Sequence, residues 1–171
     1  MKGGERSDGG TGAGARAGGA REILLFFLRF LAASVLLYFL YIVAGGYYTR
    51  LIAVIAKPLL AAAGYDIIME KALLITEEIS LNPVVFLSLV IAVGGIDIRK
   101  KLKAAAIGIV VLTAANAIGL ALTFVSYYRE SERLWTGSEF LSLTINFFLP
   151  ILLWVVLLPI RSAFPFFRAR D

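Results

Sequence analysis

The chain has 171 residues, of which 60% are hydrophobic and 17% are charged, and its mean hydropathy of +0.85 is well above what a soluble domain needs. It contains no cysteine and no histidine, which excludes disulfides, thiolate nucleophiles, Cys/His metal sites and the usual neutral-pH general base. The net charge of +5 comes from basic residues beside apolar runs, so it does not indicate nucleic-acid binding. The composition predicts an integral membrane protein with no cofactor and no metal.

Three regions differ in composition. Residues 1–21 are rich in glycine and alanine, and such a segment cannot bury enough apolar surface to offset the entropy of ordering, so we expect a disordered tail. Residues 22–162 hold the apolar runs and are expected to form a helical membrane domain. Residues 163–171 are expected to form a short basic tail.

The first apolar run, residues 23–48, is longer than the core of a signal peptide and predicts an uncleaved membrane helix. Residues 51–63 are also apolar, but Pro58 interrupts a helix there, so we expect an interfacial segment. Residues 65–80 carry four carboxylates and β-favouring isoleucines, which predicts an external hairpin or loop.

Three more apolar runs follow, at residues 83–98, 104–127 and 140–160, and each predicts a membrane helix. The run at 83–98 is short and contains Gly94 and Gly95. The predicted fold is therefore an all-α integral membrane protein with about four transmembrane helices. An interfacial helix and a short external hairpin or loop are expected between the first two.

The distribution of basic residues predicts the orientation, because lysine and arginine resist translocation. With the N-terminus in the cytoplasm, twelve basic residues lie inside and five lie outside, the five being Arg50, Lys57, Lys71, Arg129 and Arg133. We therefore expect a multi-pass protein of a prokaryotic plasma membrane with both termini cytoplasmic.

The predicted span at 104–127 contains several polar residues. A carboxamide in hydrocarbon costs free energy unless it has a partner, so Asn116 should face other helices. Thr113 lies on the same helical face. Gly119 belongs to a neighbouring small-residue pair that lets another backbone approach closely.

The last predicted span repeats the pattern with Ser142 and Asn146, where Pro150 cannot donate to the Asn146 carbonyl. Asn82, just before Pro83 at the outer mouth of the second span, is expected to cap its helix. These side chains either join helices or line a cleft open to the outside. The candidate binding residues are Asn82, Thr113, Asn116, Gly119, Ser142 and Asn146.

The layout of residues 50–160 resembles the exosortase/archaeosortase family, membrane-embedded cysteine transpeptidases that process proteins with C-terminal sorting signals. The similar segments are LLAAAG, YDIIMEKALLITEEI, SLNPVVFLSLVIAVGG, IRKKLK and ANAIGL. In that family a catalytic Cys begins the helix matching 83–98, an N-x-x-R motif supplies an Arg in the next helix, and a His follows near the last span. Here Asn116 matches the motif asparagine, but Gly119 stands where the Arg is expected, and the chain has no Cys or His.

The resemblance thus implies a degenerate member, and no catalytic residue is assigned. Ser80 is a poor replacement nucleophile, because the neighbouring acids Glu77, Glu78 and Glu139 are external and no cation replaces the arginine. We expect a non-catalytic membrane protein that binds the transmembrane sorting tail of a partner protein or acts as an accessory subunit.

Two other classes of function stay open, and the lipid bilayer is a partner in each. One is a small oligomeric transporter or channel subunit, although no carboxylate or histidine lies in the middle of a span to couple ions. The other is a structural protein of a membrane assembly. The basic IRKKLK segment could contact anionic inner-leaflet lipid, but it is fully explained as a topology determinant.

Overall fold

The computed structural model describes the backbone of residues 11–79 and 81–159, and the side chains of residues 20–75 and 81–159. Every regular element in this part of the chain is helical. The elements are α1 (Thr11–Ala62), α2 (Met69–Ile79), α3 (Asn82–Ala92), α4 (Ile98–Tyr128), α5 (Glu132–Leu143), the π-helical turn η1 (Thr144–Phe148) and α6 (Leu149–Leu157).

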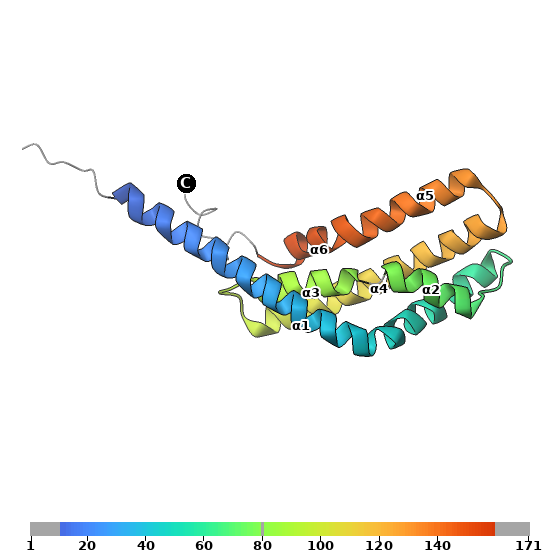
Figure 1. The fold of residues 1–171 in the computed structure, drawn as a ribbon, viewed down its shortest axis with the longest axis horizontal. Coiled ribbons are helices and arrows are strands. Elements are labelled where there is room, and N and C mark those ends of the chain that lie inside the picture. Colours follow the sequence, from blue (N-terminus) through green and yellow to red (C-terminus); the bar gives the residue numbers. More distant parts are fainter. Residues whose placement is uncertain (1–10, 80, 160–171) are drawn as a thin grey trace, which may run out of the picture.

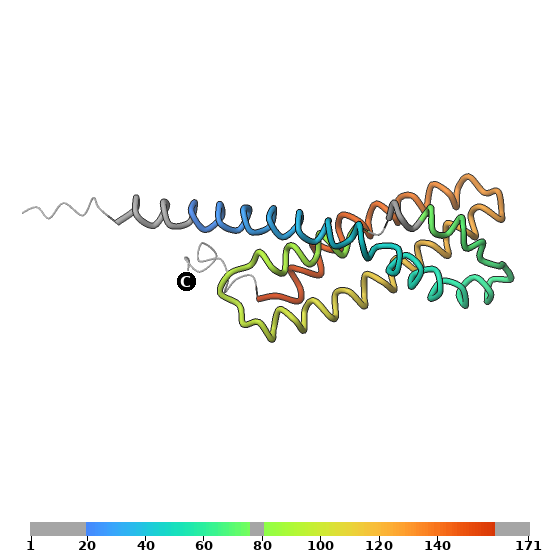
Figure 2. Tube along the Cα trace, turned by 60° about the horizontal axis from the view of Figure 1, so that its bottom comes forward, coloured from blue at the N-terminus to red at the C-terminus, as the bar shows by residue number. Residues whose placement is uncertain are grey.

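The chain passes along one elongated bundle four times (Figures 1 and 2). Helix α1 runs to one end, α2 and α3 return in succession, α4 runs out again, and α5, η1 and α6 return together. We call the end formed by the α3–α4 connection, residues 93–97, the basic end, because the lysines and arginines of residues 99–103 adjoin it. The end formed by residues 63–68 and 129–131 is the tyrosine end, after Tyr65, Tyr127 and Tyr128.

Three helices among the described residues are long and apolar enough to cross a membrane: Ala20–Ala62, Ile98–Tyr128 and Glu132–Leu157. The first two cover the predicted runs at 23–48 and 104–127, and the third covers residues 140–157 of the predicted run at 140–160. The predicted run at 83–98 instead holds α3, whose 11 residues extend about 16 Å, well short of the ~30 Å hydrocarbon core. The second pass therefore consists of two short helices, α2 and α3, and a fourth spanning helix is not confirmed.

The N-terminal tail differs in part from the prediction. Helix α1 begins at Thr11, so residues 11–21 are helical where disorder was expected. Once a long apolar helix exists, adding a residue to its end costs no new nucleation, and alanine and arginine favour helix. Residues 1–10 and the predicted basic tail at 163–171 lie outside the described part of the chain.

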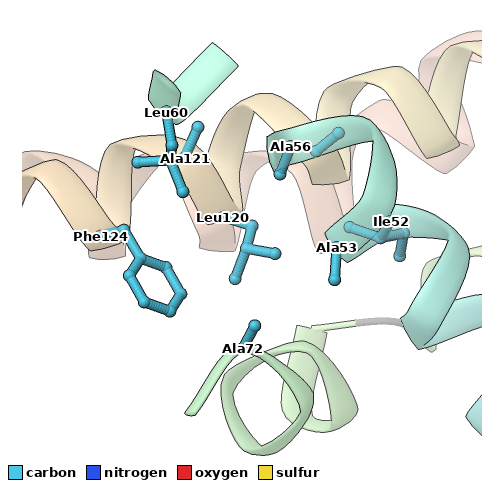
Figure 3. Close-up of a cluster of buried hydrophobic side chains, with 9 residues drawn as sticks. Ile52, Ala53, Ala56, Leu60, Ala72, Leu120, Ala121 and Phe124 are labelled. Atoms are coloured by element: carbon cyan, nitrogen blue, oxygen red, sulfur yellow. The ribbon is translucent and has the colours of Figure 1, made fainter. Parts of the chain in front are cut away.

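Residues 51–62 are helical, but the interruption predicted at Pro58 is wrong, because the segment is not a separate helix and α1 continues through Pro58 to Ala62. Burial supplies the reason. Ile52, Ala53, Ala56 and Leu60 are fully buried against Ala72 of α2 and against Leu120, Ala121 and Phe124 of α4 (Figure 3). This apolar contact outweighs the hydrogen bond that Pro58 removes. The helix stops beyond Ala62, where Gly64 adopts a positive φ of 82° and Tyr65 N–H bonds the Leu60 carbonyl at 3.0 Å.

The hairpin or loop predicted for residues 65–80 is only partly present: residues 65–68 form a loop, but Met69–Ile79 form helix α2. Its Ala72 enters the buried cluster of Figure 3, and this contact overrides the β preference of the isoleucines. Helix α2 ends where it does because Pro83 has no N–H for the Ile79 carbonyl, and its ring would collide with that carbonyl. The same proline then occupies the first turn of α3, where a missing N–H is harmless.

A second buried cluster fills the half of the bundle nearer the basic end. It joins α3, α4 and the end of α6 through Phe86, Val90, Val93, Ala104, Leu112 and Leu158. Phe86 is fully buried and packs directly on the backbone of α4 at Gly108. A Cβ atom at Gly108 would lie 2.1 Å from Cε1 of Phe86, so only glycine fits there. The close approach of α3 and α4 depends on this pair.

We predict that Gly108→Ala lowers the thermal stability of the detergent-solubilised protein by about 1–3 kcal/mol, because the buried Phe86 ring has no free space to move into. The additional substitution Phe86→Leu should recover part of this loss. Gly137→Ala is the matched control, since a Cβ there meets nothing within 4 Å. Equal melting temperatures for the Gly108 and Gly137 variants would contradict the packing argument.

Candidate functional site

Two carboxamides face each other inside the bundle and form the centre of the candidate site. Asn82 Nδ2 donates to Asn116 Oδ1 at 2.9 Å, and Asn116 Nδ2 donates back to Asn82 Oδ1 at 3.1 Å. Both side chains are buried, with exposed fractions of 1% and 3%. The two reciprocal bonds join the start of α3 to the middle of α4 and remove the cost of placing either amide in apolar surroundings.

Tyr48 of α1 and Thr113 of α4 extend the network on one side. Asn116 Nδ2 uses its second proton to bond the Tyr48 hydroxyl at 3.2 Å. Thr113 gives its single hydroxyl proton to the Ile109 carbonyl at 2.7 Å. The 3.3 Å contact between Thr113 and Tyr48 is therefore a bond that Tyr48 donates. Through Tyr48 the network reaches the first pass of the chain.

On the other side, Asn82 reaches the fourth pass. Its Nδ2 lies 3.5 Å from the carbonyl oxygen of Ile145, in the π-helical turn η1. The Leu149 N–H in that turn bonds the Thr144 carbonyl, five residues back, and Pro150 has no N–H for Ile145. The Ile145 carbonyl thus lacks a donor from its own helix and takes one from Asn82. Four passes meet at this network, and all four amide protons are used.

The structure brings together three of the six predicted binding residues. Asn82, Asn116 and Thr113 belong to the network, but Asn82 does not cap α3 as expected: it is a residue of the helix, and its side chain turns to Asn116. Gly119 lies beside Ile145, whose Cδ1 would be 3.6 Å from a Cβ on that glycine. That distance is an ordinary van der Waals contact, so Gly119 packs against the π-turn but the packing does not require glycine there.

Ser142 and Asn146 lie apart from the network. Asn146 Nδ2 is 3.4 Å from the Ser142 hydroxyl, in its own helix, and Asn146 Oδ1 is buried without a hydrogen-bond donor among the described residues. Pro150 was expected to free the Asn146 carbonyl, but the carbonyl that receives a donor from another helix is that of Ile145. The π-turn widens the helix by one residue, so the carbonyl that accepts the bond is that of Ile145 and not that of Asn146. No residue pattern in the sequence predicts this π-turn.

An accessible groove adjoins the network, and the sequence did not indicate it. A cavity of about 430 Å³ lies between α1 and the α2–α3 junction, and its lining residues are Tyr38, Tyr41, Ile42, Gly45, Gly46, Thr49, Arg50, Leu73 and Leu81. A second cavity of about 150 Å³ shares Tyr41 and Gly45 with it and extends to Tyr48, Pro83 and Leu87. We call these two cavities together the α1 groove. Tyr48 belongs both to the groove and to the amide network.

The chemistry of this region is hydrogen bonding and packing. The network consists of amides, hydroxyls and a backbone carbonyl, and the groove adds a cation, Arg50, at the level where α1 leaves its charge-free stretch of residues 30–49. A nucleophile needs a base within hydrogen-bond reach, and no member of the network can serve as one. Ser80, the alternative nucleophile, lies outside the described residues.

Comparisons of this chain with models of known protein families, with curated proteins and with solved structures find no match in any of the three.

We predict that Asn82→Ala and Asn116→Ala each destabilise the protein by about 1–3 kcal/mol, because each leaves the other amide buried without its partner. The double variant should cost clearly less than the sum, since no amide is then left unpaired. Thermal unfolding in one detergent measures the cycle.

Asn146→Leu serves as the contrast in this experiment. Its amide has one weak contact in its own helix and a buried oxygen without a donor, so its removal should cost little or should stabilise the protein. A loss at Asn146 as large as that at Asn116, or full additivity in the Asn82/Asn116 cycle, would refute the assignment of the reciprocal pair.

Proposed function

We propose that this chain is a non-catalytic membrane protein that binds a transmembrane segment of a partner protein in the α1 groove. The observation that carries the proposal is the α1 groove itself, an open, mostly apolar groove beside a helix that the described residues leave largely uncovered. In the most apolar window of α1 only 6% of the residues are buried, against 44% in α4. Helix α1 therefore has exposed apolar surface against which another helix can pack.

The groove has the shape that helix packing in lipid requires. Two rows of α1 residues spaced four apart line it: Tyr38, Ile42, Gly46 and Arg50 form one, and Tyr41, Gly45 and Thr49 form the other. Gly46 is the open position of the groove, because a Cβ there would meet nothing within 4 Å, whereas Gly45 is buried under the Tyr41 ring, with Tyr41 Cε2 2.9 Å from the position of a Cβ. Small residues at such a position let two backbones approach closely, which is what drives helix association where water is absent.

Arg50 places a positive charge at one end of the groove. It is exposed at the end of the charge-free stretch 30–49 and lines the wider cavity. A partner helix whose apolar segment ends in an acidic residue would place a carboxylate beside this cation. Such a pair at the edge of the hydrocarbon would fix both the depth and the orientation of the partner.

The topology and the family resemblance enter the same proposal. With both termini in the cytoplasm of a prokaryotic cell, as the basic residues favour, the Arg50 end of the groove faces outside. In this topology the second pass also crosses the membrane, as the two short helices α2 and α3, which brings the number of crossings to four. Resemblance to exosortases and archaeosortases supports a tail-binding role without their chemistry. A transporter or channel subunit is less well supported, because the amides of Asn82 and Asn116 are paired with each other.

Site-directed photocrosslinking in native membranes tests the proposal. A photoreactive residue at Ile42, which is 61% exposed and lines the groove, should form an adduct with an apolar segment of a partner protein. The same residue at Phe148, which is 70% exposed but lies on the fourth pass, should not. Gly46→Trp should abolish the Ile42 adduct by filling the groove. Arg50→Glu should reduce it by about tenfold or more, because it replaces an attraction by a repulsion.

Mass spectrometry of the crosslinked peptides identifies the occupant. An adduct that maps to a transmembrane segment with an acidic residue at its end supports the proposal, and a lysine substituted for that acid should restore binding to the Arg50→Glu variant. Adducts at Ile42 with lipid alone, with a second copy of this chain, or unchanged in the Gly46→Trp variant would each reject it.

A further inference from the structure

Two cations from different helices lie together at the basic end. Lys101 of α4 donates from Nζ to the Ile91 carbonyl at 3.1 Å. Arg29 of α1 places Nη1 2.8 Å from the position that a Cβ on Gly94 would take. Ile91 is in the last turn of α3, and Gly94 lies two residues beyond the end of that helix. Both cations therefore contact residues 91–94, so three passes of the chain bring two like charges to the same end of the bundle.

Neither cation has a carboxylate partner among the described residues. The bond to Ile91 is the polar contact of Lys101, and no ion pair joins Arg29 to Asp97 or to another described acid. The last carbonyls of α3 attract the cations, since a helix carries partial negative charge at its C-terminus, but they supply only about half a charge. Among the described residues, therefore, no carboxylate that pairs with either cation balances the remaining positive charge.

The surroundings of the pair combine a positive field with apolar walls. Helix α4 begins at Ile98 with no side-chain cap, so its first N–H groups face the same end of the bundle. Leu28 and Leu102, which adjoin the two cations in sequence, and Ile98, the first residue of α4, are 54%, 63% and 64% exposed. Arg29 precedes the charge-free stretch 30–49, which places the pair at the boundary between hydrocarbon and headgroups.

We propose that Arg29 and Lys101 form a binding site for the phosphate of an anionic membrane lipid. The phosphate would lie between the guanidinium and the ammonium group, and its acyl chains would lie along the exposed leucines and isoleucine. Arginine matches phosphate oxygens with a planar set of donors, and lysine adds a compact charge. In the proposed topology this lipid belongs to the inner leaflet.

The site is separate from the α1 groove. Arg29 and Arg50 lie at opposite ends of the stretch 30–49, so a negative result for lipid binding leaves the groove proposal intact, and the reverse also holds.

Native mass spectrometry of the full chain in a neutral detergent tests the lipid site. The probes are phosphatidylglycerol and phosphatidylcholine with identical acyl chains. We expect the protein to retain phosphatidylglycerol in preference to phosphatidylcholine. Each basic side chain near the surface is worth about fivefold in the dissociation constant, so Arg29→Gln and Lys101→Gln should each weaken binding about fivefold, and the double variant about 25-fold. Lys101→Arg, which keeps the charge, should bind as the unmodified chain does.

The matched control is Lys57→Gln/Arg133→Gln, which removes two exposed cations from the other half of the bundle and should leave phosphatidylglycerol binding unchanged. Inorganic phosphate at the same concentration should not displace the lipid, because it gains nothing from the apolar walls. Equal binding of the two lipids, equal losses in the two double variants, or displacement by inorganic phosphate would each overturn the proposal. The single variants decide the matter if the Arg29/Lys101 double variant does not fold.

Discussion

The reciprocal hydrogen bonds between Asn82 and Asn116 are the constraint on which the rest of the bundle depends. Where no water is present, an amide without a partner is costly, so each of the two can be tolerated only while the other is in place. The pair fixes the register of α3 against α4. Its remaining protons then reach Tyr48 and the Ile145 carbonyl, which ties the first and fourth passes to the same level. One pair of side chains therefore sets the relative height of all four passes.

Two backbone irregularities are explained by the same network. The second pass is divided into α2 and α3, and the fourth contains the π-turn η1. Both lie next to a proline, Pro83 or Pro150, that removes a backbone donor. At Pro83 the break turns the Asn82 side chain into the interior, and at Pro150 the π-turn leaves the Ile145 carbonyl free to accept from it. Irregular backbone is acceptable at membrane depth because these side chains satisfy it.

The outer surface of the first pass contrasts with this closed interior. The network leaves few unpaired polar groups inside, whereas α1 offers an open groove at Gly46 and contributes Arg29 to a pair of cations. Both features lie between α1 and its neighbours. The groove is an apolar surface that no described helix covers, and the two cations have no anionic partner among the described residues. The proposed contacts with a partner helix and with lipid phosphate would cover this apolar surface and pair this positive charge.

The sequence by itself determined the membrane class, the three long helices and the inward direction of Asn116, because hydrophobic run length and the cost of a lone amide in hydrocarbon act locally. Tertiary structure alone decided the partner of Asn116, the path of residues 51–63 and the helix at 69–79. Proline and β-branched residues argue against helix in those two segments, but apolar burial against α4 outweighs such local preferences, and burial depends on residues up to about seventy positions away. The α1 groove and the Arg29–Lys101 pair were beyond prediction for the same reason, since each exists only once separate helices lie side by side.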